Sequence, residues 1–193
     1  MRARWALALL PILTGCGYNT IQSLDEQANS AKQQIEVQLQ RRADLVPNLV
    51  ATVKGQAQQE LEVFTEVAKA RAGVMGAVQK GDPTEMANAE SQLNGALGRL
   101  LVVAEAYPQL KSDQAFLRLQ DELTGTENRV AVARTDYNNT VQQYNTYIRR
   151  FPASVTAKVI GSKPRGYFEV TTPGAREAPN VDFSKPGTPP ATK

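Results

Sequence analysis

A heptad repeat in the C-terminal half constrains the fold of this chain more than any other feature. Large apolar or aromatic side chains recur at every seventh position: Phe116, Leu123, Val130, Tyr137, Tyr144 and Phe151. This spacing puts them on one face of an α-helix, and a long run of it is typical of helices that supercoil around partners. Pro108 and Pro152 bracket the segment, as prolines do near helix ends. The sequence therefore predicts a long helix over about residues 113–151.

Weaker apolar stripes predict three further helices, over about residues 21–43, 45–79 and 84–106. The first break is expected at residues 41–50, where Asp44 can cap a helix and Pro47 can occupy its first turn. The alternative is one long helix kinked at Pro47. Four helices of this kind predict an all-α fold with coiled-coil packing.

The helical pattern ends at Pro152. Residues 153–170 mix Val, Ile, Tyr and Phe with Gly and Pro, so we expect an extended segment that packs on the helices. Residues 171–193 are rich in proline and poor in apolar side chains, which predicts a disordered tail.

The absence of histidine and the single cysteine restrict the chemistry. Without histidine the chain cannot form Ser-His-Asp or Cys-His sites or the usual zinc sites, and Cys16 alone excludes an intramolecular disulfide. The net charge is +3, and removing the segment with Arg2 and Arg4 leaves 20 basic and 19 acidic residues, or +1. That balance gives no basis for nucleic-acid binding. We expect no enzyme activity, no metal and no cofactor.

Residues 1–15 resemble a lipoprotein signal peptide. Arg2 and Arg4 precede a short apolar run, Trp5–Leu13, whereas a membrane-spanning helix takes about 20 apolar residues. Small residues then precede Cys16, as in the lipobox, in which the cysteine is lipidated and becomes the new N-terminus. The alternative is an ordinary secretory signal with an incidental cysteine.

The lipobox interpretation predicts cleavage before Cys16, a diacylglyceryl group on its thiol whose acyl chains, such as palmitate, enter the membrane, and a short tether at residues 16–20. The protein would then be anchored by lipid in the bacterial cell envelope. Gly17 rather than aspartate follows the cysteine. By resemblance to Gram-negative lipoproteins, this favours the periplasmic face of the outer membrane in a Gram-negative host.

Polar residues interrupt or flank the predicted apolar stripes: Gln56, Glu60, Arg71, Glu105, Gln120, Glu127 and Arg134. A buried charge must be paired, so our hypothesis is that Arg71 and Arg134 each pair with Glu60, Glu105 or Glu127 between helices. The simplest interpretation is that this polar seam fixes helix register. The alternatives are a carboxylate metal site, although such bundle sites use Glu-x-x-His, a proton-transfer or hydrolytic site, and a ligand cavity.

Two Tyr-Asn pairs, Tyr137-Asn138 and Tyr144-Asn145, are separated by seven residues. We interpret them as core aromatics whose hydroxyls reach the bundle edge, with asparagine on the flank. A stacking platform for sugars or bases is the alternative, and no basic groove accompanies it.

These residues together resemble the LemA family of bacterial envelope proteins, over about residues 18–170. The matching segments are Tyr18-Asn19, Arg41-Arg42-x-Asp44-Leu45-Val46-Pro47-Asn48, Glu60, Ala70-Arg71, Glu105-x-Tyr107-Pro108, Gln120, Glu127-Asn128, Arg134, and the two Tyr-Asn pairs. The resemblance implies an antiparallel four-helix bundle over residues 21–152, held to a membrane by its N-terminus and without an established enzymatic activity. The family commonly begins with a transmembrane helix, for which the lipobox-like signal substitutes here.

The sequence thus favours a non-enzymatic, lipid-anchored scaffold or adaptor for envelope proteins, without a nucleic-acid partner. The alternative is a ligand-binding helical module that uses the polar seam. Arg41, Arg42 and Asp44, expected at a bundle end, are the best candidates for an exposed contact; capping and surface solvation are the alternative role.

Overall fold

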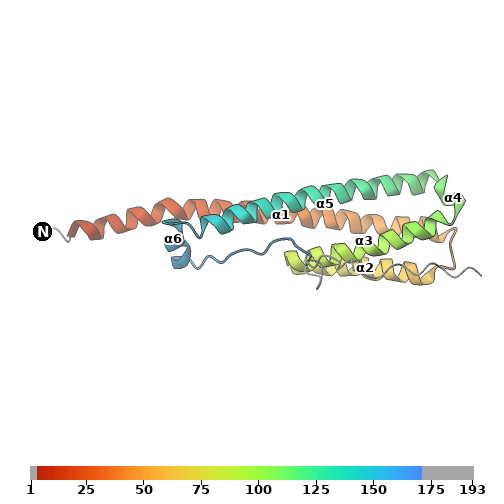
Figure 1. Ribbon diagram of the computed structural model, residues 1–193, viewed down its shortest axis with the longest axis horizontal. Coiled ribbons are helices and arrows are strands. Elements are labelled where there is room, and N and C mark those ends of the chain that lie inside the picture. Colours follow the sequence, from red (N-terminus) through yellow and green to blue (C-terminus); the bar gives the residue numbers. More distant parts are fainter. Residues whose placement is uncertain (1–3, 171–193) are drawn as a thin grey trace, which may run out of the picture.

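The computed structural model describes residues 4–170, with side chains from residue 17 onward. Within that range the chain is helical and has no strand, so the predicted all-α class is confirmed. Six helices follow one another (Figure 1): α1 Arg4–Lys54, α2 Leu61–Lys80, α3 Pro83–Glu105, α4 Pro108–Lys111, α5 Gln114–Tyr147 and α6 Ala153–Val159. The predicted tail at residues 171–193 lies outside the described residues.

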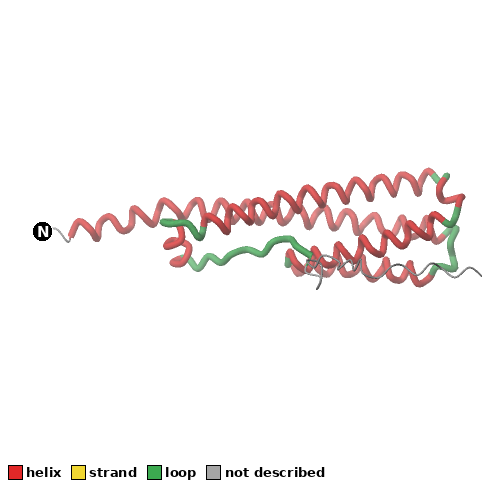
Figure 2. The backbone as a smooth tube through the Cα atoms, viewed as in Figure 1, coloured by secondary structure: helices red, strands yellow, loops and turns green. Residues whose placement is uncertain are grey.

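The long helices α1 and α5 lie side by side over most of their length (Figure 1). The hairpin of α2 and α3 covers one half of this pair, whereas α6 packs on the N-terminal half of α1. Residues 160–170, which we call the strap, run from α6 towards the α2–α3 turn as a long loop (Figure 2). One apolar core joins α1, α2, α3, α5 and Phe168 of the strap, and a smaller cluster lies beside α6.

Two caps explain where α3 and α5 begin. Asp82 accepts a hydrogen bond from the Glu85 backbone N–H at 2.8 Å, and Pro83 follows in the first turn, where its missing N–H costs nothing. Asp113 accepts hydrogen bonds from the N–H groups of Ala115 and Phe116 at 2.7 and 3.1 Å. Gly81 ends α2 with a φ of +67°, a conformation that glycine adopts without strain.

The helix boundary expected at residues 41–50 is wrong. Helix α1 continues through Pro47 to Lys54, and the break falls at residues 55–60, so α2 begins only at Leu61. The alternative of one long helix kinked at Pro47 is right that α1 continues through this proline, but wrong that the helix runs on to about residue 79, because α1 ends at Lys54.

A side chain from α2 allows Pro47 to lie inside α1. Proline has no N–H, so the carbonyl of Ala43, four residues earlier, loses its helical donor. Ala43 is fully buried, where an unpaired carbonyl is costly. The Arg71 Nε donates to this carbonyl at 2.8 Å. Arg71 therefore replaces the hydrogen bond that proline removes and ties α2 to α1.

The segment expected to be extended over residues 153–170 is partly helical. Residues 153–159 form α6, and Ala153 and Ala157 are buried where α6 packs on α1. Gly17 of α1 lies at this contact, where an added Cβ would be 3.5 Å from the Cα of Ala153, an ordinary van der Waals distance. Residues 160–170 lack regular secondary structure.

Within the described part of the chain, no helix has a run of residues that is both long and apolar enough to cross a bilayer.

The link between Pro47 and Arg71 can be tested by a double-mutant cycle. We expect Arg71→Ala to lower the free energy of unfolding by about 1–3 kcal/mol, because it leaves the Ala43 carbonyl buried and unpaired. In the Pro47→Ala background the N–H at position 47 can bond the same carbonyl, so the cost should be smaller. Urea unfolding of the four proteins gives the coupling energy.

Lys69→Ala, an exposed change on the same helix, is the control and should have little effect in either background. Equal costs of Arg71→Ala with and without Pro47 would show that the two residues act independently.

Candidate functional site

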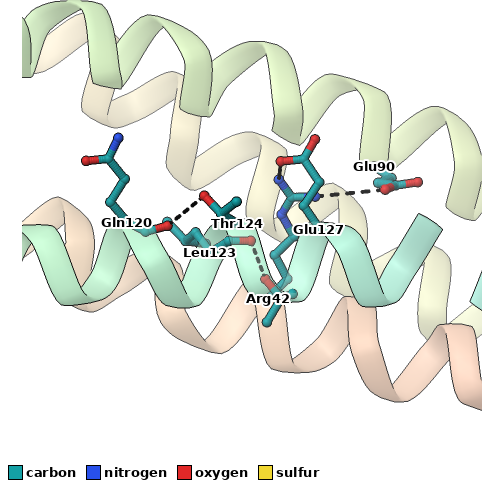
Figure 3. A network of polar contacts seen from close by, with 7 residues as sticks. Arg42, Glu90, Gln120, Leu123, Thr124 and Glu127 are labelled. Atoms are coloured by element: carbon teal, nitrogen blue, oxygen red, sulfur yellow. Dashed lines mark hydrogen bonds and ion pairs between the residues drawn. The ribbon is translucent and has the colours of Figure 1, made fainter. Parts of the chain in front are cut away.

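A buried arginine joins three helices at the centre of the described polar contacts (Figure 3). Arg42 of α1 has only 3% of its surface exposed. Its Nη2 donates to Glu127 Oε2 of α5 at 3.2 Å, and its Nη1 lies 3.9 Å from Glu90 Oε1 of α3. A guanidinium in such a site is stable only when carboxylates compensate its charge, so these contacts fix α1, α3 and α5 relative to one another.

The two carboxylates have different surroundings. The Glu127 side chain is 54% exposed, whereas that of Glu90 is 11% exposed. Burial raises the pKa of Glu90, and the charges of Arg42 and Arg134 oppose this effect only in part. Arg42 therefore has two carboxylate partners: Glu127, which is well exposed to solvent, and Glu90, which is largely buried.

The pairing expected for the polar seam is wrong. Among the described residues neither Arg71 nor Arg134 forms an ion pair: Arg71 bonds the Ala43 carbonyl, and Arg134 is exposed. Glu127 does form an interhelical pair, but with Arg42. The 3.6-residue period identifies a helix face but not which edge of that face meets a neighbouring helix, so Arg134 can follow the apolar series of α5 and still be exposed.

The remaining seam residues lie apart from this centre. Glu60 precedes α2 at its N-cap position and makes no capping bond. Glu105 and Gln120 are exposed and line a pocket of about 190 Å³ near α4, while Tyr107 packs partly buried against the core. Gln56 is exposed.

The expected exposed contact at a bundle end is only partly observed. Arg41 and Asp44 are exposed, but Arg42 is buried, and all three lie within α1 rather than at its end. The continuous helix is the reason, because it moves the chain reversal to residues 55–60.

The two Tyr-Asn pairs hold the strap on α5. Asn138 Oδ1 accepts from the Phe168 N–H at 2.8 Å, and its Nδ2 donates to the Phe168 carbonyl at 3.2 Å. Asn145 contacts Arg165 in the same way, at 2.8 and 2.9 Å. The buried Tyr137 hydroxyl donates to the Gly166 carbonyl at 2.8 Å, and burial raises the pKa of this hydroxyl. We call the two asparagines the amide clamps.

The spacing of the amide clamps matches the strap. Seven residues of an α-helix and three residues of extended chain both rise about 10 Å. Asn145 holds residue 165 and Asn138 holds residue 168, so the strap runs antiparallel to α5. An amide has both a donor and an acceptor, so each clamp satisfies the N–H and the C=O of one residue. The clamps thus bind the main chain, whatever its side chains.

Side chains of the strap supply additional contacts. Phe168 is 2% exposed and belongs to the main apolar core. The Arg165 Nε donates to Asp25 Oδ1 of α1 at 2.8 Å, and this hydrogen bond raises the pKa of Arg165. The guanidinium carbon of Arg165 lies 5.7 Å from the centre of the Tyr144 ring. Tyr144 and Tyr137 are therefore core aromatics, as expected, whereas the asparagines make the contacts that the sequence did not reveal.

A separate groove of about 690 Å³ lies between α1 and α5. Small and amide side chains line most of it, among them Gln34, Gln38, Asn128 and Ala133. None of Glu60, Arg71, Glu127 and Arg134 lines this groove. No group of three or more acidic, cysteine or histidine side chains within the described residues could hold a metal ion.

The sequence pattern did not identify Glu90 or the strap residues as members of the site. Glu90 occupies the stripe Met86, Glu90, Leu93, Leu97, so a charged residue at an apolar position was the available indication. For Arg165 and Phe168 no local pattern was available, since their partners are far away in the sequence.

The pKa of Glu90 predicts a pH-dependent effect. The pKa of Glu90 is higher in the folded protein than in the unfolded chain, so the protonated carboxyl favours folding. This contribution to stability is complete below the ordinary pKa of 4.5 and is lost as pH rises through the pKa of Glu90 in the folded protein. Glu90→Gln removes this dependence. We therefore expect the stability of Glu90→Gln relative to wild type to increase as pH rises from about 4 to 7, measured by urea unfolding. Glu122→Gln, an exposed change on α5, is the control, and a constant difference for Glu90→Gln would contradict the assignment.

Removal of one amide clamp should release the strap locally. We expect Asn138→Ala to abolish amide hydrogen-exchange protection at residue 168, and Asn145→Ala to do so at residue 165, while protection in α3 is retained. Asn139→Ala is a matched control, since Asn139 is exposed beside the first clamp. Unchanged exchange in both clamp variants would mean that Phe168 alone holds the strap.

Comparison with known proteins identifies the group to which this fold belongs. The chain is 29% identical to the magnetosome proteins MamQ 1 and MamQ 2 of Paramagnetospirillum magneticum, over 79% of its own length and 64% of theirs. It is 26% identical to the magnetosome protein MamQ of Magnetospirillum gryphiswaldense, over 78% of its length and again 64% of the relative. The chain thus spans less than two thirds of these relatives. The LemA family profile matches residues 31–183, and the chain belongs to the LemA family.

Proposed function

We propose that this protein is a non-enzymatic, lipid-anchored scaffold or adaptor of the cell envelope. In this proposal α1 is a stalk that holds the fold at the membrane, and the section in which α1, α2, α3 and α5 lie side by side is the antiparallel four-helix bundle of the family. The partner is an envelope protein rather than a nucleic acid.

The observation that carries the proposal is the relation of the fold to α1. This helix has 51 residues, or about 75 Å. Its first described core side chain is Ile21, shortly after Cys16, and the other helices pack on the part that follows. Cleavage before Cys16 would therefore leave the described core intact. The α4 end of the molecule would be presented at a distance from the membrane (Figure 1).

The geometry of the site favours a scaffold over an enzyme. Several buried or half-buried polar groups of the described residues hold elements together: Arg42 links three helices, Arg71 bonds the α1 backbone, and the amide clamps hold the strap. Such arrangements fix register and shape. Proton transfer requires a base beside a reacting group, and the ion pairs of Arg42 provide no such arrangement.

The alternative of a ligand-binding module on the polar seam finds less support. The groove between α1 and α5 is not lined by the seam residues that would recognise a ligand there. The named relatives are magnetosome proteins, and from them we take only a role as a component of a larger cellular structure.

The proposal predicts that Cys16 carries the anchor and that partner contact depends on it. Cells expressing wild type should incorporate an alkyne-palmitate label into the protein, whereas Cys16→Ala should not, because the thiol is the acceptor. Crosslinking in living cells should capture a specific envelope protein with wild type and lose it with Cys16→Ala. Thr20→Ala, an exposed change nearby, should behave like wild type.

Fluorescence of the purified mature protein provides a second readout. Trp5 is the only tryptophan, so cleavage before Cys16 leaves tyrosine emission alone. Equal labelling of wild type and Cys16→Ala, or tryptophan emission from the membrane-bound form, would contradict the lipoprotein assignment.

A further inference from the structure

The end of the molecule that holds α6 has a one-sided charge. Arg149, Arg150, Lys158 and Lys163 are all exposed there. Residues 148–164 and residues 17–24 contain no aspartate or glutamate. Asp25, the first acidic residue along α1, is paired with Arg165. The basic groups at this end are therefore not neutralised by acidic residues of the same segments.

The same end exposes large apolar side chains. Phe151 is 81% exposed, Val159 76%, Val155 50% and Ile160 37%. Val155 and Val159 are four residues apart and share a face of α6. Ala153 and Ala157 are buried on the opposite face, which packs on α1. Helix α6 thus has apolar side chains on its outer as well as its inner face, which is unusual for a helix whose outer face is exposed to water.

The position of α6 suggests what covers its outer face. The helix packs beside Gly17 of α1, directly next to residues 4–16, which include the apolar run and Cys16. Figure 1 shows α6 at the end from which this part of α1 extends beyond the other helices. An anchor at Cys16 would therefore bring α6 to the bilayer surface.

We infer that this end of the molecule carries a membrane-contact patch that lies on an anionic lipid surface. The patch consists of four apolar residues, Phe151, Val155, Val159 and Ile160, and four basic residues, Arg149, Arg150, Lys158 and Lys163. The apolar side chains enter the headgroup boundary, and the basic ones bind the negative surface. This inference rests on the proposed anchoring, which supplies proximity, and adds a second contact that sets the orientation of the stalk.

The test uses the full chain with one tryptophan. Trp5→Phe combined with Phe151→Trp places the fluorophore in the membrane-contact patch, and Trp5→Phe combined with Val102→Trp places it at an exposed position of α3. Both proteins are coupled through Cys16, the only cysteine, to maleimide lipid in vesicles. The vesicles contain phosphatidylcholine alone or with phosphatidylglycerol. This coupling makes attachment independent of natural lipidation.

On phosphatidylglycerol vesicles we expect emission from position 151 to shift to shorter wavelength and to be quenched by brominated lipid. Emission from position 102 should stay unchanged on both vesicle types. If the tethered protein shows the emission of a solvent-exposed tryptophan at position 151 on phosphatidylglycerol vesicles, the inference is overturned. The patch would then be the binding site of a protein partner instead of a membrane. The alkyne-palmitate experiment on Cys16 would be unaffected, so the two proposals fail separately.

The contribution of charge is measured without the tether, on the full chain with Cys16→Ser. Each basic residue near an anionic surface increases partitioning about five-fold, so Arg149→Gln with Arg150→Gln should weaken binding to phosphatidylglycerol vesicles by about 25-fold. Lys54→Gln with Lys111→Gln removes the same charge at the opposite end and should have little effect. Equal losses for both pairs would show that net charge, rather than the membrane-contact patch, determines binding.

Discussion

The hydrogen bond from Arg71 to the Ala43 carbonyl is the interaction on which the architecture depends. It permits proline inside a buried stretch of helix, so α1 remains one continuous element from the N-terminal segment to the far end of the molecule. Because α1 is continuous, α6 and the α2–α3 hairpin pack on the same helix. The same bond positions α2, since its donor is a side chain of that helix.

A second constraint follows from the unequal lengths of the helices. The α2–α3 hairpin covers only part of the α1–α5 pair, and the strap lies along part of the remainder (Figure 1). An extended segment has unpaired backbone groups, which need partners where the chain is partly buried. Asn138 and Asn145 provide them from one helix face. The Tyr-Asn repeat therefore contributes to two parts of the structure: the tyrosines pack in the core and the asparagines hold the strap.

The sequence predicted helix content and the start of α5 well, because periodicity and capping are local properties. It failed at Pro47, since the rule that proline ends a helix assumes that the freed carbonyl has no tertiary donor. It also expected Arg134 to be buried, because spacing does not show which edge of an apolar face meets a neighbouring helix. It expected Arg42 to be exposed, because the break expected at residues 41–50 placed that residue at a bundle end. The partners of Asn138 and Asn145 lie at least 20 residues away along the chain, beyond what a local pattern contains.

The amide clamps hold main-chain atoms at residues 165 and 168, and Tyr167 between them is exposed. The side chain at position 167 can therefore be changed without loss of these contacts, whereas insertion or deletion of one residue between the clamps would prevent both contacts from forming together. In this segment the fold constrains the number of residues between positions 165 and 168 more than the identity of the side chain at position 167. A reporter dye attached at position 167 would follow the strap without altering what holds it.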